Sequence, residues 1–298
     1  MDTNETVVRL RRTAVRDGDP PRGFGIALIG LAAALVLNTV LGPLVAGVVE
    51  YPFSDTLRNQ LIGLEIVTVA MVAPLSLAAG ILASRGHRAA AVLAFGPAAY
   101  TAYMFVQYVL GPEYAEYGPV IVFQLALFAC GALLAVWAWQ LIDDDSLPAI
   151  SRRRARVYGI VLLALAAFVI SRYLGAISGS LRDGPIPEEF AEARTFYWSI
   201  VLLDLGVVVP ATIIAGIGLL RGARWSRKAL YAVLGWFALV PPSVAAMAAA
   251  MFVNEDPHAS AGQVVVFSIA AIVFAALAVR VYLPLFGRGD ADSPPRAA

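Results

Sequence analysis

Cysteine, lysine and histidine are scarce in this 298-residue sequence, and their scarcity excludes several kinds of site. The chain has one cysteine (Cys130), one lysine (Lys228) and two histidines (His87 and His258). A disulfide within the chain and a Cys-x-x-Cys redox pair each need two cysteines. Both histidines fall in predicted loops, which excludes a haem held by two intramembrane histidines and a His-Glu-x-x-His zinc site. We therefore expect no cofactor and no bound metal.

Charged residues are also few, because they make up 14% of the chain while hydrophobic residues make up 60%. A soluble domain averages about 25% charged and about 45–50% apolar residues. The apolar excess cannot be buried in one soluble core of this size, so it is expected to face lipid. Net charge is only +1, and no phosphate-binding loop, dinucleotide fingerprint or nucleic-acid motif is present. No nucleic-acid partner is expected.

Long apolar runs, in contrast, are abundant. A bilayer core of about 30 Å needs about 20 residues of helix, and the runs that reach this length are 24–49, 58–84, 89–111, 119–141, 156–178, 196–220, 228–252 and 262–286. The sequence therefore predicts an all-α polytopic membrane protein with eight transmembrane helices. The predicted organisation is a basic, disordered tail (1–23), a first four-helix half (24–141), a linker (142–155), a second four-helix half (156–286) and a short tail (287–298).

Basic residues predict the orientation of these spans. Eighteen of the 22 arginine and lysine residues fall in the two tails and in the turns on the same side of the predicted bundle. By the positive-inside rule this side is cytoplasmic, so both termini are expected in the cytoplasm. The near-replacement of lysine by arginine reflects genome composition, and we expect a multi-pass protein of a bacterial-type cytoplasmic membrane.

The two halves share a sequence pattern that indicates a parallel tandem repeat of four plus four helices. At an offset of 136 residues, Pro74, Ala79, Gly80, Ile81, Arg85 and Gly86 match Pro210, Ala215, Gly216, Ile217, Arg221 and Gly222. A second match, at an offset of 134, relates the first span to the fifth. Many transporters are built from such repeats and bind their substrate between them. Chance alignment of helices rich in alanine, leucine and glycine is the alternative interpretation.

Polar residues within the spans are the candidate site. An ionisable group in a membrane helix costs about 2.5–3.5 kcal/mol on insertion scales and usually marks a pathway or a partner. Three such residues are Glu65, Arg172 and Asp204, and uncharged polar residues at similar depth are Asn38, Tyr100, Tyr103, Gln107 and Gln124. We expect them to line a cavity that opens to the external side, about one-third of the way into the membrane. The alternatives are a structural ion pair between Arg172 and either acid, and interfacial snorkelling.

Prolines within the predicted spans indicate helix breaks, because each proline removes a backbone hydrogen bond. They are Pro43, Pro74, Pro97, Pro210 and the pair Pro241–Pro242. The pair is the strongest candidate for a break.

Three functions fit these patterns. The first is a small permease or ligand-binding membrane protein, in which Glu65 and Asp204 bind a cation or proton, and Arg172 binds an anionic group or neutralises an acid. Tyr100, Tyr103 and Gln107 would then orient a small-molecule or ion ligand. The second is a non-catalytic accessory or assembly subunit with a membrane-protein partner. The third, an intramembrane lipid-modifying enzyme, lacks an evident nucleophile–base pair or metal cluster, so we expect no enzymatic activity.

Overall fold

The computed structural model describes residues 20–116, 118–182 and 184–287, and these residues form an all-helical bundle. The predicted tails, 1–23 and 287–298, lie largely outside the described residues. Within the described part, eight helices are long and apolar enough to cross a membrane, which confirms the predicted number of spans.

Three spans are single helices and five are interrupted or followed by a short helix. In chain order they are α2 (Arg22–Leu41); α3, η1 and α4 (Asp55–Val67, Thr68–Val72, Ala73–Ser84); α5 (Ala89–Leu110); α6 (Pro119–Leu141); α7 and the short α8 (Arg152–Arg172, Leu174–Ser180); α9, η4 and α10 (Arg194–Leu203, Asp204–Val208, Val209–Arg221); α11 and α12 (Ser226–Phe237, Val240–Val253); and α13 with η5 (Ala261–Tyr282, Leu283–Phe286). Short 3-10 turns lie in two connections, η2 (Asp144–Ser146) and η3 (Glu188–Phe190).

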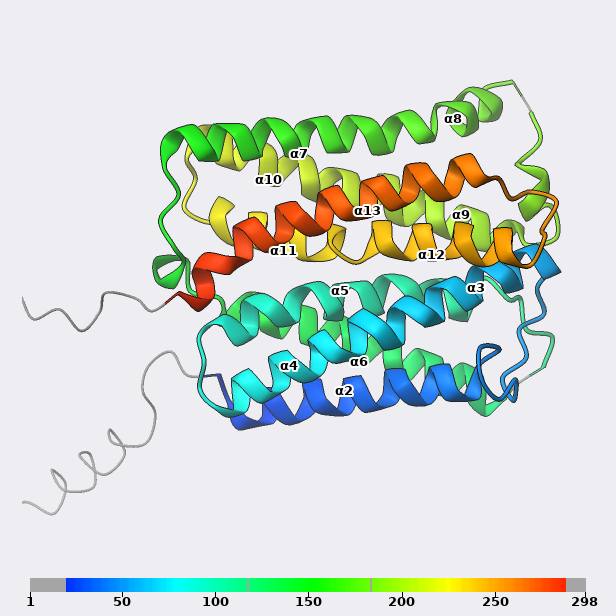
Figure 1. The fold of residues 1–298 in the computed structure, drawn as a ribbon, viewed down its shortest axis with the longest axis horizontal. Coiled ribbons are helices and arrows are strands. Elements are labelled where there is room, and N and C mark those ends of the chain that lie inside the picture. Colours follow the sequence, from blue (N-terminus) through cyan, green and yellow to red (C-terminus); the bar gives the residue numbers. More distant parts are fainter. Residues whose placement is uncertain (1–19, 117, 183, 288–298) are drawn as a thin grey trace, which may run out of the picture.

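The spans form two layers (Figure 1). One layer holds α2 to α6 and the other holds α7 to α13, so each predicted half occupies its own layer. The first and last described helices begin and end at the same end of the bundle, which we call the terminal end. The opposite end, which we call the far end, carries the connections 42–54, 111–118, 173–193 and 254–260.

Glycines allow the closest approaches between helices. Where α5 crosses α11, between the layers, a Cβ atom on Gly96 would lie 2.8 Å from the carbonyl carbon and oxygen of Gly235. Within the first layer Gly25 faces Gly80, and within the second Gly159 faces Gly216, each pair leaving only 2.9 Å between an added Cβ and the opposite carbonyl oxygen. Small residues let membrane helices pack backbone against backbone, so these crossings fix the spacing of the spans.

Two spans contain the same helical irregularity. The second and sixth spans each widen into a five-residue π-helical segment, η1 and η4, followed at the second position of the next helix by Pro74 or Pro210. The carbonyl of Thr68 accepts from the N–H of Ala73, five residues later, and that of Asp204 accepts from Val209. Proline lacks a backbone N–H, and its ring crowds the preceding helical turn. The regular α-helical hydrogen-bond pattern is therefore disturbed in that turn.

Other prolines act differently. The predicted break of the seventh span occurs at Ala238–Leu239, and Pro241 and Pro242 lie in the first turns of α12. Pro97 lies inside α5, which continues through it. Pro43 does not lie in a span, contrary to expectation, because α2 ends at Leu41 and not at residue 49. Gly42 is extended there, and the chain folds back over the far end.

On one side of the far end, hydrogen bonds join the two layers. The carboxylate of Asp256, after α12, accepts hydrogen bonds from Asn59 Nδ2 (3.1 Å) and Thr56 Oγ1 (3.3 Å) at the start of α3. Farther along α3, a Cβ on Gly63 would overlap the backbone of Ala246 and Met247. Helix α3 therefore packs directly on α12, and the cavity described next lies beside this contact.

Candidate ligand-binding site

A cavity of about 360 Å³ lies between the layers toward the far end of the bundle. Residues from α3, α5, α7, α9, η4, α12, α13 and the connection after α7 line it. Its polar lining residues are Gln60, Tyr103, Gln107, Arg172, Tyr173, Glu189, Tyr197, Asp204 and Gln263. Four of the eight predicted site residues, Tyr103, Gln107, Arg172 and Asp204, therefore meet at one place. We call this space the polar cavity.

Asp204 is held in the cavity wall by two tyrosines. It is the first residue of η4 and is 8% exposed. Tyr103 Oη, from the first layer, donates to Oδ1 at 2.6 Å, and Tyr173 Oη, from the second layer, donates to Oδ2 at 2.5 Å. The carboxylate therefore bridges the two layers through hydrogen bonds to phenols, and its two oxygens are already engaged.

Arg172, the last residue of α7, is exposed and lines the same cavity. Within the described part of the chain the only ion pair closer than 4.0 Å is Arg58–Asp55, at 3.6 Å. The structural ion pair considered from the sequence is therefore not formed, because the Arg172 guanidinium contacts neither Asp204 nor Glu65 at that distance. Its positive charge remains available to a group that enters the cavity.

Gln107 presents the clearest sign of a missing partner. Its side chain is 4% exposed and lines the polar cavity, yet its Nε2 atom has no hydrogen-bond partner among the described residues. A buried donor left unpaired costs about 1–3 kcal/mol, so buried polar groups are nearly always satisfied. Because Gln107 lines the cavity, an acceptor oxygen of a bound ligand could supply the partner that this amide lacks.

Glu189 adds a second carboxyl group to the cavity wall. It lies in η3, in the connection outside the spans. Burial, followed by the nearby charge of Asp256, raises the pKa of Glu189, while His258 opposes the shift. Glu189 is therefore protonated more easily than a solvent-exposed glutamate.

Glu65, Asn38 and Gln124 lie elsewhere, in a buried cluster inside the first layer. Glu65 is 1% exposed, and its Oε2 accepts the backbone N–H of Leu44 at 3.0 Å. Gln124 Nε2 donates to Tyr51 Oη at 3.1 Å, while its Oε1 accepts from Tyr114 Oη at 3.3 Å. The 42–54 connection thus folds over this cluster, and none of its three polar residues lines the polar cavity.

Tyr100 is also outside the polar cavity. Its hydroxyl lies 2.7 Å from Ser243 Oγ, which itself donates to the Leu239 carbonyl at 2.9 Å. Tyr100 therefore donates to Ser243 and supports the broken seventh span, so the structure gives it a packing position.

Several lining residues were not predicted from the sequence. Tyr173 follows Arg172 directly, but it lay inside a predicted span that in fact ends at Arg172. Gln60 is near the start of α3, and Gln263 near the start of α13, where polar residues are ordinary. Only a three-dimensional arrangement distinguishes these residues from interfacial ones.

Comparison of the chain with protein-family models, curated proteins and solved structures gave no match. Eight apolar helices are compatible with a multi-pass membrane protein, and any specific function has to be inferred from the site itself.

Proposed function

We propose that this chain is a multi-pass membrane protein that binds a ligand in the polar cavity, as a small permease or ligand-binding protein. The observation that carries the proposal is the unpaired Nε2 donor of Gln107, buried in the cavity wall. In this proposal Gln107 donates to the ligand, Arg172 attracts a negative group, and Asp204 positions Tyr103 and Tyr173. Glu65 belongs to the separate cluster and is left out of ligand binding.

The proposed orientation places the terminal end in the cytoplasm and opens the polar cavity to the outside of a bacterial-type membrane. Its support is the clustering of basic residues at the terminal end, by the positive-inside rule. The described ones are Arg22, Arg85, Arg88, Arg152, Arg153, Arg154, Arg156, Arg221, Arg224, Arg227, Lys228 and Arg280.

A tandem duplication is also part of the proposal. The segments η1 and η4 begin 136 residues apart, at Thr68 and Asp204, which is the offset of the sequence match. The close pairs Gly25–Gly80 and Gly159–Gly216 recur in the two layers, and Gly96 meets Gly235 between them. A ligand site between two related halves is the arrangement expected of a transporter built from repeats.

A binding role is favoured here over catalysis. Both histidines, His87 and His258, lie in connections between spans, at opposite ends of the bundle. Among the described residues, the lining of the polar cavity contains two acids, Asp204 and Glu189, but no serine, cysteine, histidine or lysine that could pair with them as a nucleophile.

Thiol labelling in intact cells tests whether the cavity opens outward. In a Cys130→Ala background, a membrane-impermeant maleimide should label Arg172→Cys quickly and Gln107→Cys more slowly, because both side chains line the cavity. Gln124→Cys is the matched control, since Gln124 is 0% exposed in the other cluster and should stay unlabelled. A Gln107→Cys thiol as unreactive as the control would contradict the proposal.

A further inference from the structure

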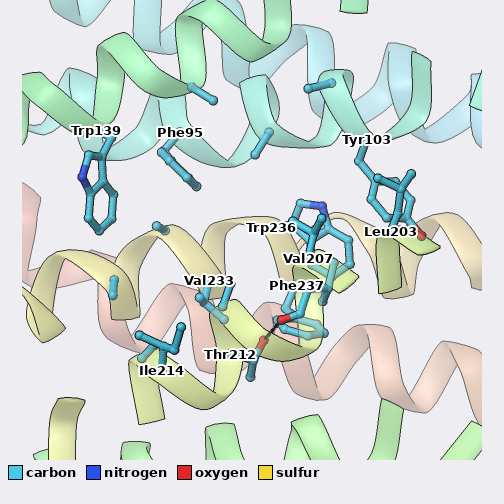
Figure 2. Close-up of a pocket in the computed structure, with 18 of the residues that line it drawn as sticks. Phe95, Tyr103, Trp139, Leu203, Val207, Thr212, Ile214, Val233, Trp236 and Phe237 are labelled. Carbon is cyan, nitrogen blue, oxygen red and sulfur yellow. Dashed lines mark hydrogen bonds between the residues drawn. The ribbon is translucent and has the colours of Figure 1, made fainter. Parts of the chain in front are cut away.

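A second and larger cavity, of about 570 Å³, lies between the layers and is lined almost entirely by apolar side chains. Helices α5 and α6 form one wall, and η4, α10 and α11 form the other. Figure 2 shows the labelled side chains converging on this space, with Trp139 near one end and Tyr103 near the other. We call it the apolar cleft.

The apolar cleft has the length of a lipid chain segment. On α5 its lining residues extend from Phe95 to Val106, which corresponds to about 17 Å at 1.5 Å per residue. This is a little more than half of a hydrocarbon core of about 30 Å. Trp139 and Trp225 mark the cleft at the terminal end, so it extends from that interface toward the polar cavity.

Tyr103 joins the two cavities, because it lines both. Its ring packs edge-on against Trp236 in the cleft, with centroids 5.3 Å apart, while its hydroxyl donates to Asp204 in the polar cavity. A molecule that occupied both spaces would pass this ring, with a polar group on one side and an apolar group on the other.

The polar side favours an anionic head. Gln107 Nε2 is an unpaired donor, and the Arg172 guanidinium has no carboxylate within 4.0 Å among the described residues. Each oxygen of Asp204 already accepts a hydrogen bond from a tyrosine, and the other carboxyl group of the lining, Glu189, lies in η3 outside the spans, so Gln107 and Arg172 are the donors that remain for a ligand. A phosphate has several acceptor oxygens and a negative charge, which matches both donors.

The apolar side favours a hydrocarbon chain. Thr212, a polar residue of the cleft, donates to the Val208 carbonyl at 2.7 Å, so its hydroxyl does not require a ligand. Apolar cavities of this kind do not hold water and bind apolar molecules instead. Because the cleft lies among membrane-spanning helices, lipid chains are the hydrocarbon available to fill it.

We propose that the ligand is an anionic phospholipid, with its phosphate head in the polar cavity and one acyl chain in the apolar cleft. This inference rests on the proposed function and names its ligand class. The phosphate head group of the bound lipid would then lie at the depth of Gln107, which is deeper in the membrane than the head groups of the surrounding lipids.

Tryptophan fluorescence tests this proposal, because three of the five tryptophans, Trp139, Trp225 and Trp236, line the cleft. The full chain in a neutral detergent is titrated with phosphatidylglycerol that carries brominated acyl chains, which quench nearby indoles. We expect saturable quenching that is largely lost in the cleft-filling variant Ala99→Leu/Ala211→Leu. In Trp236→Phe the quenching should be reduced and not abolished, because Trp139 and Trp225 still line the cleft. Ala276→Leu, an exposed position of α13 outside the cleft, is the matched control and should bind normally.

The head group is tested with Arg172→Gln and Gln107→Met. Each should weaken phosphatidylglycerol binding at least tenfold, while brominated phosphatidylcholine should bind the wild-type chain more weakly than phosphatidylglycerol. Equal quenching by the two lipids, or unchanged quenching in the cleft-filling variant, would overturn the lipid proposal. If the double variant does not fold, Ala211→Leu alone gives the same decision.

The two proposals fail in different ways. In one outcome, inorganic phosphate slows the labelling of Gln107→Cys, and the cleft-filling variant is quenched by brominated lipid as strongly as wild type. The ligand is then a small polar anion, and only the lipid proposal is wrong. If Gln107→Cys is unreactive from outside and brominated lipid does not quench, both are wrong.

Discussion

At the scale of single residues, the same amide side chain has opposite surroundings on two helices of the first layer, α5 and α6. Gln107 and Gln124 are both almost completely buried. Gln124 is bonded at its nitrogen by Tyr51 and at its oxygen by Tyr114, while Gln107 leaves its nitrogen unpaired beside a cavity. A group kept unsatisfied destabilises the fold, which is typical of positions retained for binding.

Replacing each glutamine by methionine should therefore change stability in opposite directions. Gln107→Met removes an unpaired donor, and we expect it to raise the free energy of unfolding by about 1–3 kcal/mol. Gln124→Met leaves two tyrosine hydroxyls without a partner, and we expect it to lower that free energy by a similar amount. Thermal unfolding in detergent measures both, and a destabilised Gln107→Met would show that this amide has a structural partner.

Residue type and position in a span were enough to predict four of the residues that line the cavity. Tyr103, Gln107, Arg172 and Asp204 are conspicuous because polar groups are costly in apolar helices. The same rule also selected Glu65, whose partner is the Leu44 N–H in a connection. The other oxygen of Glu65, Oε1, has no hydrogen-bond partner among the described residues. The sequence does not reveal how that connection folds back, so it cannot separate polar groups covered by a connection from those that line a cavity.

At the scale of helices, Gly63 is one of the glycines that allow the two layers to touch. A Cβ on Gly63 would overlap the α12 backbone, so Gly63→Ala should force α3 and α12 apart and cost about 1–3 kcal/mol of stability. Gly30→Ala is the matched control, because nothing lies within 4 Å of a Cβ added there on α2. It should be neutral or stabilise by up to about 1 kcal/mol. Thermal unfolding of the two variants, compared with wild type, decides whether the contact is as close as described.

The prolines show how far helix breaks were predictable. Pro241 and Pro242 coincide with the expected break, and Pro74 and Pro210 follow the π-helical segments. Pro97, with the same chemistry, leaves α5 continuous. The outcome depends on how neighbouring helices support the turn before the proline, and composition does not contain that information.

At the scale of the whole molecule, Asp256 links the layers at the far end and should make stability depend on pH. Burial alone would raise the pKa of Asp256, but hydrogen bonds from the His258 N–H, Asn59 and Thr56, with the nearby His258 ring, lower it below its ordinary value. Glu189, also nearby, is the acid whose own pKa is raised.

A carboxyl group with a lowered folded-state pKa stabilises the fold above its unfolded pKa, and this contribution disappears as the pH falls through the folded pKa. Thermal unfolding of wild type should therefore weaken as the pH falls below about 4, the ordinary range of an aspartate. Asp256→Asn should be less stable than wild type at pH 6 and should approach it at acidic pH. Parallel pH profiles for the two proteins would exclude this role.

The single lysine limits how interaction partners can be detected. Lys228 is 9% exposed, its Nζ donates to the Ile142 carbonyl at 3.0 Å, and it lies over the Trp139 ring at 4.5 Å. Beside it, Arg227 Nη1 donates to the Leu147 carbonyl at 3.1 Å, so the connection between the layers covers this amine. Amine-reactive cross-linkers will therefore find no accessible lysine on the folded bundle. A partner subunit would escape detection by that chemistry, and carboxyl-directed reagents aimed at the acidic connections of the far end are the appropriate choice.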